Sequence, residues 1–295
     1  CDTWAHDIDS FGRQIGKFGQ AAAECIENGP VRKVVRVRST YGASVLTQDF
    51  ILYHNLKQVE VRARIDWREH HKMLKLSFDV NVTEARAVAE IPYGWIERET
   101  DGGEEPCQQW IDLLGCTEDH TVAGLALLND SKYSYDALQS TLSMTVLRSP
   151  IYADHGGERD GLCEFMEQGG TEFCYSICPH SGDFKEAGLV KRAYERNIPP
   201  QWVVETFHKG RFGCFYEGIS ISKDNLIASA LKKAEDGGGY ILRVYECDGY
   251  ETQAEISLPA LGRTFIADFS PCEIKTFYLP KERDLSVRET NFLED

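Results

Sequence analysis

The stretch V59-E-V-R-A-R-I-D-W67, followed by L74-K-L-S-F-D-V-N-V82, decides the fold class of this chain. In both segments apolar and polar side chains alternate strictly, so an extended strand would carry the apolar ones on one face and the polar ones on the other. Such one-sided strands are typical of antiparallel sheets that bury one face and leave the other in water. Because only REHHKM separates the two segments, we expect them to pair as a hairpin.

The same alternation recurs along the first two thirds of the chain. Val35 and Val37 alternate with Arg36 and Arg38, after the turn signal NGP at positions 28–30. The pattern predicts further strands at 22–28, 44–53, 87–92, 122–128, 140–147 and 171–177. So many strands with one apolar face predict a large antiparallel β-sandwich over residues 1–200.

A helix is predicted at 185–196, where Ala187, Val190 and Tyr194 form one apolar stripe, and the sequence NIPP at positions 197–200 would end it. Shorter strands are expected after it at 202–206, 213–220, 241–246, 252–257, 263–268 and 273–279. The stretch 226–236 has a helical composition, but its position between strands makes a strand an equal alternative. We therefore predict a second, smaller β-sandwich over residues 201–295 and an all-β fold for the whole chain.

The composition limits the classes of partner. The 295 residues carry a formal net charge of −15, and 42% hydrophobic with 27% charged residues is ordinary for a soluble globular protein. Because the acidic residues are spread along the chain, they argue against nucleic acid and membranes as partners. No apolar run approaches the roughly 20 residues that a membrane-spanning helix needs. The opening CDTWAHD lacks a methionine and a signal-peptide pattern, so we expect it to lie inside a longer protein.

The ten cysteines show no CxxC spacing, and the nearest pair is Cys174 and Cys178. A zinc finger or ribbon is therefore not expected. We interpret the cysteines mostly as small buried apolar residues of an intracellular protein, and we expect a cytoplasmic location.

Residues with recognisable catalytic spacing are few. The adjacent His70 and His71 would point to opposite faces of a strand, so they predict a solvated turn rather than a metal site. His180 predicts a hydrogen-bonded turn, and Gly237–Gly239 lacks the strand and helix that a phosphate-binding loop requires. No GxSxG, P-loop or HExxH pattern is present. A pair of catalytic carboxylates cannot be recognised by spacing among 47 acidic residues.

One polar stretch between apolar runs could touch a ligand. N129-D-S-K-Y-S-Y-D136 follows GLALL and precedes LSMTVL, and most of its side chains can form hydrogen bonds. From the residues alone, this stretch is either a solvated hairpin tip or a surface for a polar ligand such as a sugar.

Short motifs in a fixed order resemble glycoside hydrolase family 38, the class II α-mannosidases. The opening DTWAHDIDSF resembles the family's SDTWSHG segment, where its C-terminal β region begins. Further matches follow in the same order along nearly the whole chain: VRARIDWREHHKMLKLSFDV, EIPYGWIER, QQWIDL, GLALLNDSKYSYD, LRSPIYADHGG, FCYSICPHSGDF and SALKKAEDGGGYILRVYE. The ordered set is specific. One departure is a shortened loop after Arg98, where only ETDGGEEPC leads to Gln108.

The resemblance implies a fold and an activity. The fold would be a supersandwich of the galactose mutarotase-like kind, followed by a smaller β-sandwich. The parent enzyme would hydrolyse terminal α-mannosyl linkages of a mannose-containing glycan with retention. In this family the nucleophilic aspartate and the zinc ligands lie on an N-terminal catalytic barrel and just after it. We therefore expect zinc in the full-length parent, no catalytic residue, metal ligand or cofactor in this chain, and an inactive chain that packs on the barrel.

The resemblance also implies a role for N129-D-S-K-Y-S-Y-D136, because the family places a loop there at the rim of the substrate site. The candidate rim residues are Asn129, Asp130, Lys132, Tyr135 and Asp136. In some relatives an arginine of this loop reaches the substrate, but no arginine occurs between positions 129 and 136 here.

Two other classes remain open: a stand-alone carbohydrate-binding module and a purely structural module. A binding module would be indicated by exposed tryptophans on one strand face. The five tryptophans are scattered instead, at Trp4, Trp67, Trp95, Trp110 and Trp202.

Overall fold

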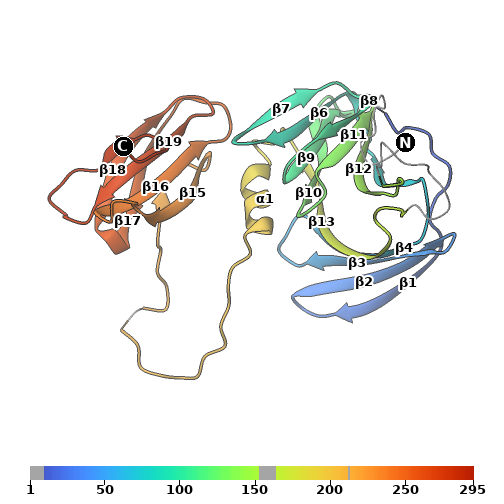
Figure 1. The fold of residues 1–295 in the computed structure, drawn as a ribbon, viewed down its shortest axis with the longest axis horizontal. Helices are drawn as coiled ribbons and strands as arrows, with labels where there is room; N and C mark the ends of the chain where they lie inside the picture. Colours follow the sequence, from blue (N-terminus) through green and yellow to red (C-terminus); the bar gives the residue numbers. More distant parts are fainter. Residues whose placement is uncertain (1–9, 153–163, 212) are drawn as a thin grey trace. The chain divides into compact units, whose positions relative to one another are not determined.

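The computed structural model describes residues 10–152, 164–211 and 213–295. Within these ranges the chain is almost entirely β, with one α-helix and one short 3-10 helix (Figure 1). The all-β fold that the alternation predicts is therefore confirmed. The chain divides into two compact units, Cys1–Ile91 with Ile96–Ile198, and Pro92–Trp95 with Pro199–Asp295.

The first unit contains two sheets. The larger has nine strands in the order β1-β2-β3-β4-β13-β10-β9-β6-β7, and the smaller has four in the order β5-β12-β11-β8. The strands of the larger sheet are β1 (Gly19–Asn28), β2 (Arg32–Tyr41), β3 (Ser44–Tyr53), β4 (Val59–Trp67), β13 (Gly169–Ser181), β10 (Val122–Asn129), β9 (Trp110–Cys116), β6 (Thr83–Ile91) and β7 (Gly94–Arg98). Those of the smaller are β5 (Met73–Asp79), β12 (Thr141–Arg148), β11 (Ser134–Leu138) and β8 (Asp101–Pro106).

The alternation of β4 separates core from solvent, as the sequence predicts. Val61, Ala63, Ile65 and Trp67 are buried and belong to the main hydrophobic cluster, whereas Arg62 and Arg64 between them are exposed. From the smaller sheet, buried residues of the same cluster include Leu74, Tyr135, Leu142 and Met144. Each large aliphatic side chain buried here contributes about 1.5–3 kcal/mol relative to exposure.

The predicted hairpin between residues 59–67 and 74–82 is wrong. β4 pairs with β3 and β13 in the nine-stranded sheet, while β5 pairs with β12 in the four-stranded sheet. A hairpin would lay the two apolar faces side by side, each still needing a cover, whereas separate sheets can bury them against each other. REHHKM therefore connects two sheets. His70 and His71 remain exposed in it, and the ring of His70 stacks on Phe165 with 3.8 Å between centroids.

Helix α1 (Leu189–Asn197) lies against β10 and β9, where Leu189, Val190 and Ala193 are buried. It begins four residues later than the sequence predicts, because Gly188 adopts a left-handed conformation at φ 62° directly before it. The prolines at 199 and 200 follow its end, as the sequence predicts.

His180 does not form the turn that the sequence predicts. It lies in β13, where its Nε2 atom shares a 2.9 Å hydrogen bond with the buried carboxylate of Asp112. Burial disfavours the charged imidazole, but the hydrogen bond and charge of Asp112 outweigh this effect and raise the pKa of His180. Gly124 provides the space, because a Cβ atom there would lie only 2.9 Å from the imidazole ring.

The second unit also has two sheets, with the orders β14-β17-β18 and β15-β16-β19-β20. Their strands are β14 (Ser220–Ile221), β17 (Thr252–Leu258), β18 (Arg263–Phe269), β15 (Leu226–Lys233), β16 (Gly239–Glu246), β19 (Ile274–Pro280) and β20 (Arg288–Thr290), with the 3-10 helix η1 at Pro259–Leu261. Its cluster of buried residues contains Leu242, Val244, Ile256 and Phe277, among others. Of the two alternatives for 226–236, the strand is the one observed.

The strands expected at 202–206 and 213–220 are wrong. Apart from Ser220 in β14, the described residues from 199 to 220 lie in neither a helix nor a strand. Their β-forming composition finds no neighbouring strand to pair with in the part of the chain that the structure describes.

The cysteines differ from the sequence interpretation. Eight lie among the described residues and all eight are free thiols, but only Cys107, Cys178 and Cys247 are buried. Cys25, Cys214 and Cys272 are exposed, so the interpretation of mostly buried cysteines is wrong. Within the described ranges, no helix has the length and hydropathy to cross a membrane.

Candidate functional site

The candidate rim stretch runs from Asn129, the last residue of β10, through a turn at 130–133 into β11. Asn129 anchors the turn. The Asn129 side chain is fully buried: Nδ2 donates to the carbonyl of Gln108 at 2.8 Å, and Oδ1 accepts from the backbone N–H of Lys132 at 2.9 Å. Its own carbonyl accepts a 3.0 Å hydrogen bond from Nδ2 of Asn197 at the end of α1. These bonds tie the turn to the 108–109 segment and to the helix.

Asp130, Ser131 and Tyr133 are the exposed residues of the turn, and Lys132 between them is half-buried. Oδ1 of Asp130 accepts hydrogen bonds from Oγ of Ser131 at 2.9 Å and from the backbone N–H of Cys174 at 3.1 Å. Nζ of Lys132 lies 5.3 Å from the centre of the Phe173 ring. The turn thus contacts two consecutive residues of β13, Phe173 and Cys174.

The two tyrosines have opposite environments. Tyr135 is 1% exposed, faces the sandwich core, and its hydroxyl accepts a 3.4 Å hydrogen bond from Nη1 of Arg98. Burial raises the pKa of the Tyr135 hydroxyl. Tyr133, which the sequence reasoning passes over, is 55% exposed and donates from its hydroxyl to the carbonyl of Asp130 at 3.3 Å. The period of two supplies a signal, because Tyr135 shares its strand face with the apolar Ala137.

Asp136 lies away from the turn, in a polar network on β5, β8, β11 and β12. Lys75 forms ion pairs with both Asp136 and Glu104, and the three side chains are only 14–16% exposed. Glu104 also accepts a 2.6 Å hydrogen bond from Oγ of Ser134 and one from the hydroxyl of Thr145.

The two carboxyls of this network have pKa values shifted in opposite directions. Burial raises the pKa of Asp136 despite its bond to Lys75. Burial also acts on Glu104, but the hydrogen bonds from Lys75, Ser134 and Thr145 outweigh it and lower its pKa.

A buried acid that the sequence reasoning also missed lies close behind the turn. Glu90, in β6, is 5% exposed, and one of its carboxylate oxygens accepts a 2.6 Å hydrogen bond from the backbone N–H of Gln109. Burial raises the pKa of Glu90 to about 7, although this hydrogen bond opposes the shift. The N–H of Cys107 donates to the carbonyl of Tyr133 at 3.0 Å, so the 107–109 segment links Glu90 to the turn. The signal was a glutamate inside the apolar run A-V-A-E-I.

The five predicted rim residues therefore do not form one surface. Asn129 and Tyr135 are buried, Asp136 belongs to the Lys75 network, Asp130 is exposed and Lys132 is half-buried. A contact with substrate stays a prediction for all five; of the turn residues, Asp130, Ser131 and Tyr133 are exposed and Lys132 is half-buried. Among the residues in the described ranges, no cluster of three or more His, Cys, Asp or Glu side chains could hold a metal ion.

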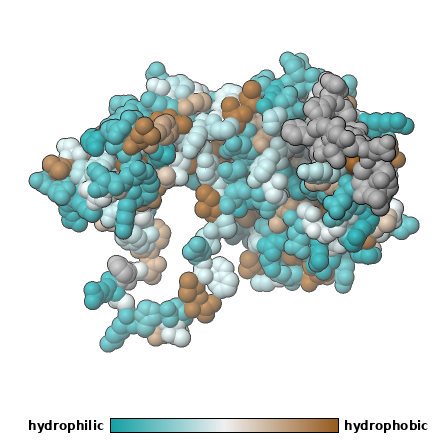
Figure 2. Space-filling model, viewed as in Figure 1, coloured by the Kyte–Doolittle hydropathy of each residue, from teal (hydrophilic) through white to brown (hydrophobic). Residues whose placement is uncertain are grey.

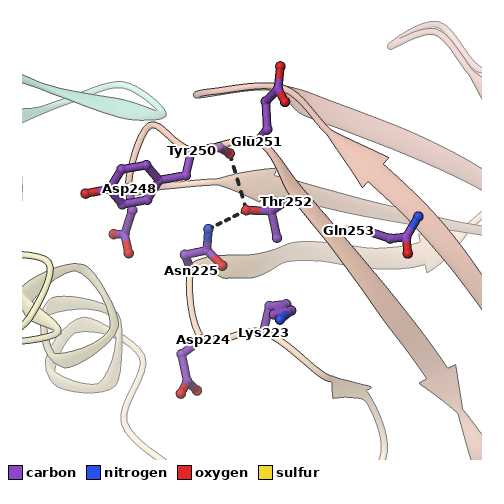
Figure 3. Close-up of a pocket in the computed structure, with 8 residues that line it drawn as sticks. All are labelled: Lys223, Asp224, Asn225, Asp248, Tyr250, Glu251, Thr252 and Gln253. Carbon is purple, nitrogen blue, oxygen red and sulfur yellow. Dashed lines mark hydrogen bonds between the residues drawn. The ribbon is translucent and has the colours of Figure 1, made fainter.

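A shallow polar hollow lies in the second unit, and Figure 3 shows its lining. Asn225 donates from Nδ2 to Oγ1 of Thr252 at 2.7 Å, and the same Oγ1 donates to the carbonyl of Tyr250 at 3.3 Å (Figure 3). The lining residues are Lys223, Asp224, Asn225, Asp248, Tyr250, Glu251, Thr252 and Gln253. These bonds brace the loops of the small unit against each other.

Comparison with known proteins identifies the family to which these elements belong. The family model for the glycosyl hydrolases family 38 C-terminal domain matches residues 2–156, and that for the family 38 C-terminal β-sandwich domain matches residues 225–267. α-Mannosidase G of Dictyostelium discoideum is 31% identical over 270 residues, which cover 85% of this chain and 23% of that protein. Human α-mannosidase 2C1 is 29% identical over 229 residues, which cover 73% of this chain and 20% of the relative.

A solved α-mannosidase from Enterococcus faecalis V583 has a similar fold, with a TM-score of 0.73 at 14% identity over 88% of this chain and 35% of that one. The chain spans about a fifth of the length of the curated relatives that it matches. The larger family model alone covers more than half of the chain, in the unit that contains the 129–136 turn. This chain belongs to glycosyl hydrolase family 38 and corresponds to its C-terminal β region.

Proposed function

We propose that this chain is the C-terminal part of a longer α-mannosidase that hydrolyses terminal α-mannosyl linkages with retention. The observation that carries the proposal is the match to α-mannosidase G, at 31% identity over 85% of this chain. In this role the two β units associate with a catalytic part of the same polypeptide, and the 129–136 turn supplies polar groups to the rim of its sugar site.

The carboxyls of the described residues argue for catalysis elsewhere in that polypeptide. A retaining glycosidase needs two carboxyl groups about 5–5.5 Å apart, one as nucleophile and one as acid. On the neighbouring strands β11 and β8, Asp136 and Glu104 are the pair to consider, and their pKa shifts in opposite directions would suit such roles. However, Lys75 forms an ion pair with each of the two carboxyls, so both are already occupied by a cation. The pair is therefore interpreted as a structural network.

Zinc belongs to the same proposal for the longer protein. The described residues do not fit a zinc site, because zinc takes three or four closely spaced nitrogen, sulfur or carboxylate ligands and no such cluster is found among them. The proposal assigns the metal to the catalytic part, and a cytoplasmic location likewise stays a prediction from the sequence.

Support for a rim role comes from how firmly the turn is held. Asn129 fixes its start to Gln108, and Asp130 fixes its tip to the backbone of β13. Groups held in this way lose little freedom on binding, which is what a sugar-binding residue requires. Asp130 and Lys132 together can accept and donate hydrogen bonds to neighbouring hydroxyls, and the exposed ring of Tyr133 can lie against a sugar face.

The alternative of a stand-alone carbohydrate-binding module gains no support from the tryptophans. Trp67 and Trp110 are buried, Trp95 is half-buried, and Trp202 is 82% exposed but lies in no strand. Trp4 lies outside the described residues.

The test measures hydrolysis of an aryl α-mannoside by the longer polypeptide and by two matched variants. Lys132→Met removes the charge but keeps a long chain over Phe173, and Lys132→Arg restores the charge. A rim contact predicts that Lys132→Met lowers kcat/KM roughly fivefold, equivalent to the loss of about 1 kcal/mol of binding, and that Lys132→Arg recovers most of it. Activity in neither the parent nor its variants would refute the proposed function. Full activity in all three would refute the rim role of Lys132 alone.

A further inference from the structure

One segment of the chain is exposed along its whole described length, although it carries large apolar side chains of the kind that folded proteins usually bury. Residues 199–218, which we call the strap segment, join α1 to β14, and every one that the structure describes is exposed. Figure 1 draws the segment as an extended trace, and Figure 2 shows hydrophobic residues along it. Its large exposed hydrophobic residues are Trp202 (82%), Val203 (85%), Val204 (84%), Phe207 (110%), Phe215 (82%) and Tyr216 (59%).

The two apolar stretches of the strap segment differ in composition from a flexible linker, although the segment also contains Pro199, Pro200, Gly210, Gly213 and Gly218. Linkers that stay free in water are rich in Gly, Ser, Pro and charged residues and poor in aromatic and β-branched ones. Here Q201-W-V-V-E-T-F207 and F215-Y are dominated by aromatic and β-branched side chains. The charged residues cancel, since Lys209 and Arg211 balance Glu205 and Glu217, whereas the whole chain carries −15. Contiguous exposed apolar residues of this kind mark an interaction surface.

Within the described ranges, no strand pairs with the backbone of the strap segment, and its backbone bonds are local, such as that from the N–H of Thr206 to the side chain of Glu205 at 2.9 Å. Its pattern predicts strands at 202–206 and 213–220, and only Ser220 is in a strand, β14. A strand forms when a neighbour satisfies its N–H and C=O groups. The clusters that form the two sandwich cores contain no residue of the strap segment, so each core closes without it. A neighbouring strand for the segment is thus not found among the described residues.

We propose that the strap segment docks on the catalytic part of the same longer polypeptide and becomes a strand there. This inference rests on the proposed function. This chain covers only 23% of α-mannosidase G, so in a protein of that size most of the polypeptide is available as a docking partner. The segment lies between the ranges that the two C-terminal family models match, 2–156 and 225–267. A second copy of this chain is a poorer partner, because two bodies of charge −15 repel each other.

Trp202 and Phe207 are the expected anchors. In an extended strand Trp202 and Val204 share one face, and Val203 and Phe207 share the other. Large aromatic side chains at the centre of an interface contribute most of its binding energy. Replacing Trp202 and Phe207 together therefore weakens whichever face docks. Ile266, 66% exposed on β18 in the second unit, provides a control substitution of another exposed apolar residue outside the segment.

The experiment compares amide hydrogen exchange of peptides spanning 201–217 in the 295-residue chain and in the longer polypeptide. We expect near-unprotected exchange in the 295-residue chain and at least tenfold slower exchange in the longer polypeptide. The double variant Trp202→Ser with Phe207→Ser should abolish this protection, and Ile266→Ser should leave it unchanged. Equal exchange in the two proteins would overturn the proposal, as would protection in the 295-residue chain alone.

The same preparations separate this inference from the proposed function. Hydrolysis of an aryl α-mannoside by the longer polypeptide reports the activity, whatever the strap segment does. An active polypeptide with an unprotected strap segment refutes docking and leaves the function standing. A protected strap segment in a polypeptide without activity supports docking and refutes the function.

Discussion

Glu90 should make the stability of this chain depend on pH in an unusual direction. Its carboxyl is buried in β6, where it accepts a hydrogen bond from the N–H of Gln109, and burial raises its pKa from 4.5 to about 7. Most carboxyls in folded proteins have lowered pKa values and stabilise the fold as pH rises. Glu90 instead destabilises the fold as pH rises, because its carboxyl in the folded chain keeps a proton that the unfolded chain has already released.

The magnitude follows from the two pKa values. The difference of about 2.5 units corresponds to about 3 kcal/mol at about 1.4 kcal/mol per unit. Between pH 4.5 and 7 the folded state binds more protons than the unfolded state, so the contribution of Glu90 to the free energy of unfolding falls as pH rises. Well below pH 4.5, Glu90 is protonated in both states and this loss of stability is absent. Above pH 7 the loss of stability is complete.

The perturbation is Glu90→Gln. Glutamine stays neutral at every pH, and its side-chain oxygen can still accept the hydrogen bond from Gln109. Urea unfolding at pH 4.5 and pH 8, followed by circular dichroism, should show the variant close to wild type at the lower pH. At pH 8 the variant should be more stable by up to about 3 kcal/mol. Glu118→Gln, at an exposed position, should match wild type at both pH values.

The refuting result is equally specific. If the stability difference between Glu90→Gln and wild type is the same at pH 4.5 and pH 8, Glu90 ionises normally and its burial does not control its charge. A variant that is less stable than wild type at pH 8 would mean that the carboxylate itself stabilises the fold.

Two further substitutions test how the turn and the small unit are held. Asn129→Ala leaves the Gln108 carbonyl and the Lys132 N–H without the hydrogen-bond partner that the buried Asn129 side chain provides. The variant should therefore lower the free energy of unfolding by about 2 kcal/mol. The control Ser131→Ala, at the exposed tip, should change it by less than about 0.5 kcal/mol. A loss of similar size in both variants would contradict the anchoring role of Asn129. In the second unit the buried Arg263 donates to the carbonyls of Pro280, Glu282, Arg283 and Leu285, so Arg263→Met should destabilise the chain by about 3 kcal/mol and speed amide exchange in residues 280–285. Unchanged exchange there would show that the loop holds its shape without the guanidinium group.

Local pattern predicts which side chains of this chain lie inside, because the period of two depends only on neighbouring residues. The buried face of β4 and the exposed arginines between its residues follow from it directly. The partner of a strand depends on distant residues, which explains why β4 and β5 were expected to pair although they lie in different sheets. The segment 199–218 has β-forming residues, yet forms no strand there because no described strand lies beside it.

For the candidate site too, the sequence predicts which residues can bond to a sugar but not which of them are already bonded to distant parts of the chain. The resemblance selects the 129–136 turn, and the chemistry of its residues selects those that can bond to a sugar. Whether a polar group is free depends on what surrounds it: Asn129 is occupied by Gln108 and α1, and Asp136 by Lys75, which is 61 positions away in sequence. Tyr133 and Glu90 were missed for the same reason, since their exposure and burial are set by the packing of several strands.

The most direct test of the central claim is the reaction of an aryl α-mannoside with the longer polypeptide and with the 295-residue chain, followed by proton NMR of the first-formed sugar. A retaining α-mannosidase releases the α-anomer before mutarotation, and we propose that the nucleophile lies in the catalytic part outside this chain. We therefore expect α-mannose from the longer polypeptide and no release from the 295-residue chain. Release of the β-anomer, or turnover by the 295-residue chain alone, would contradict this proposal.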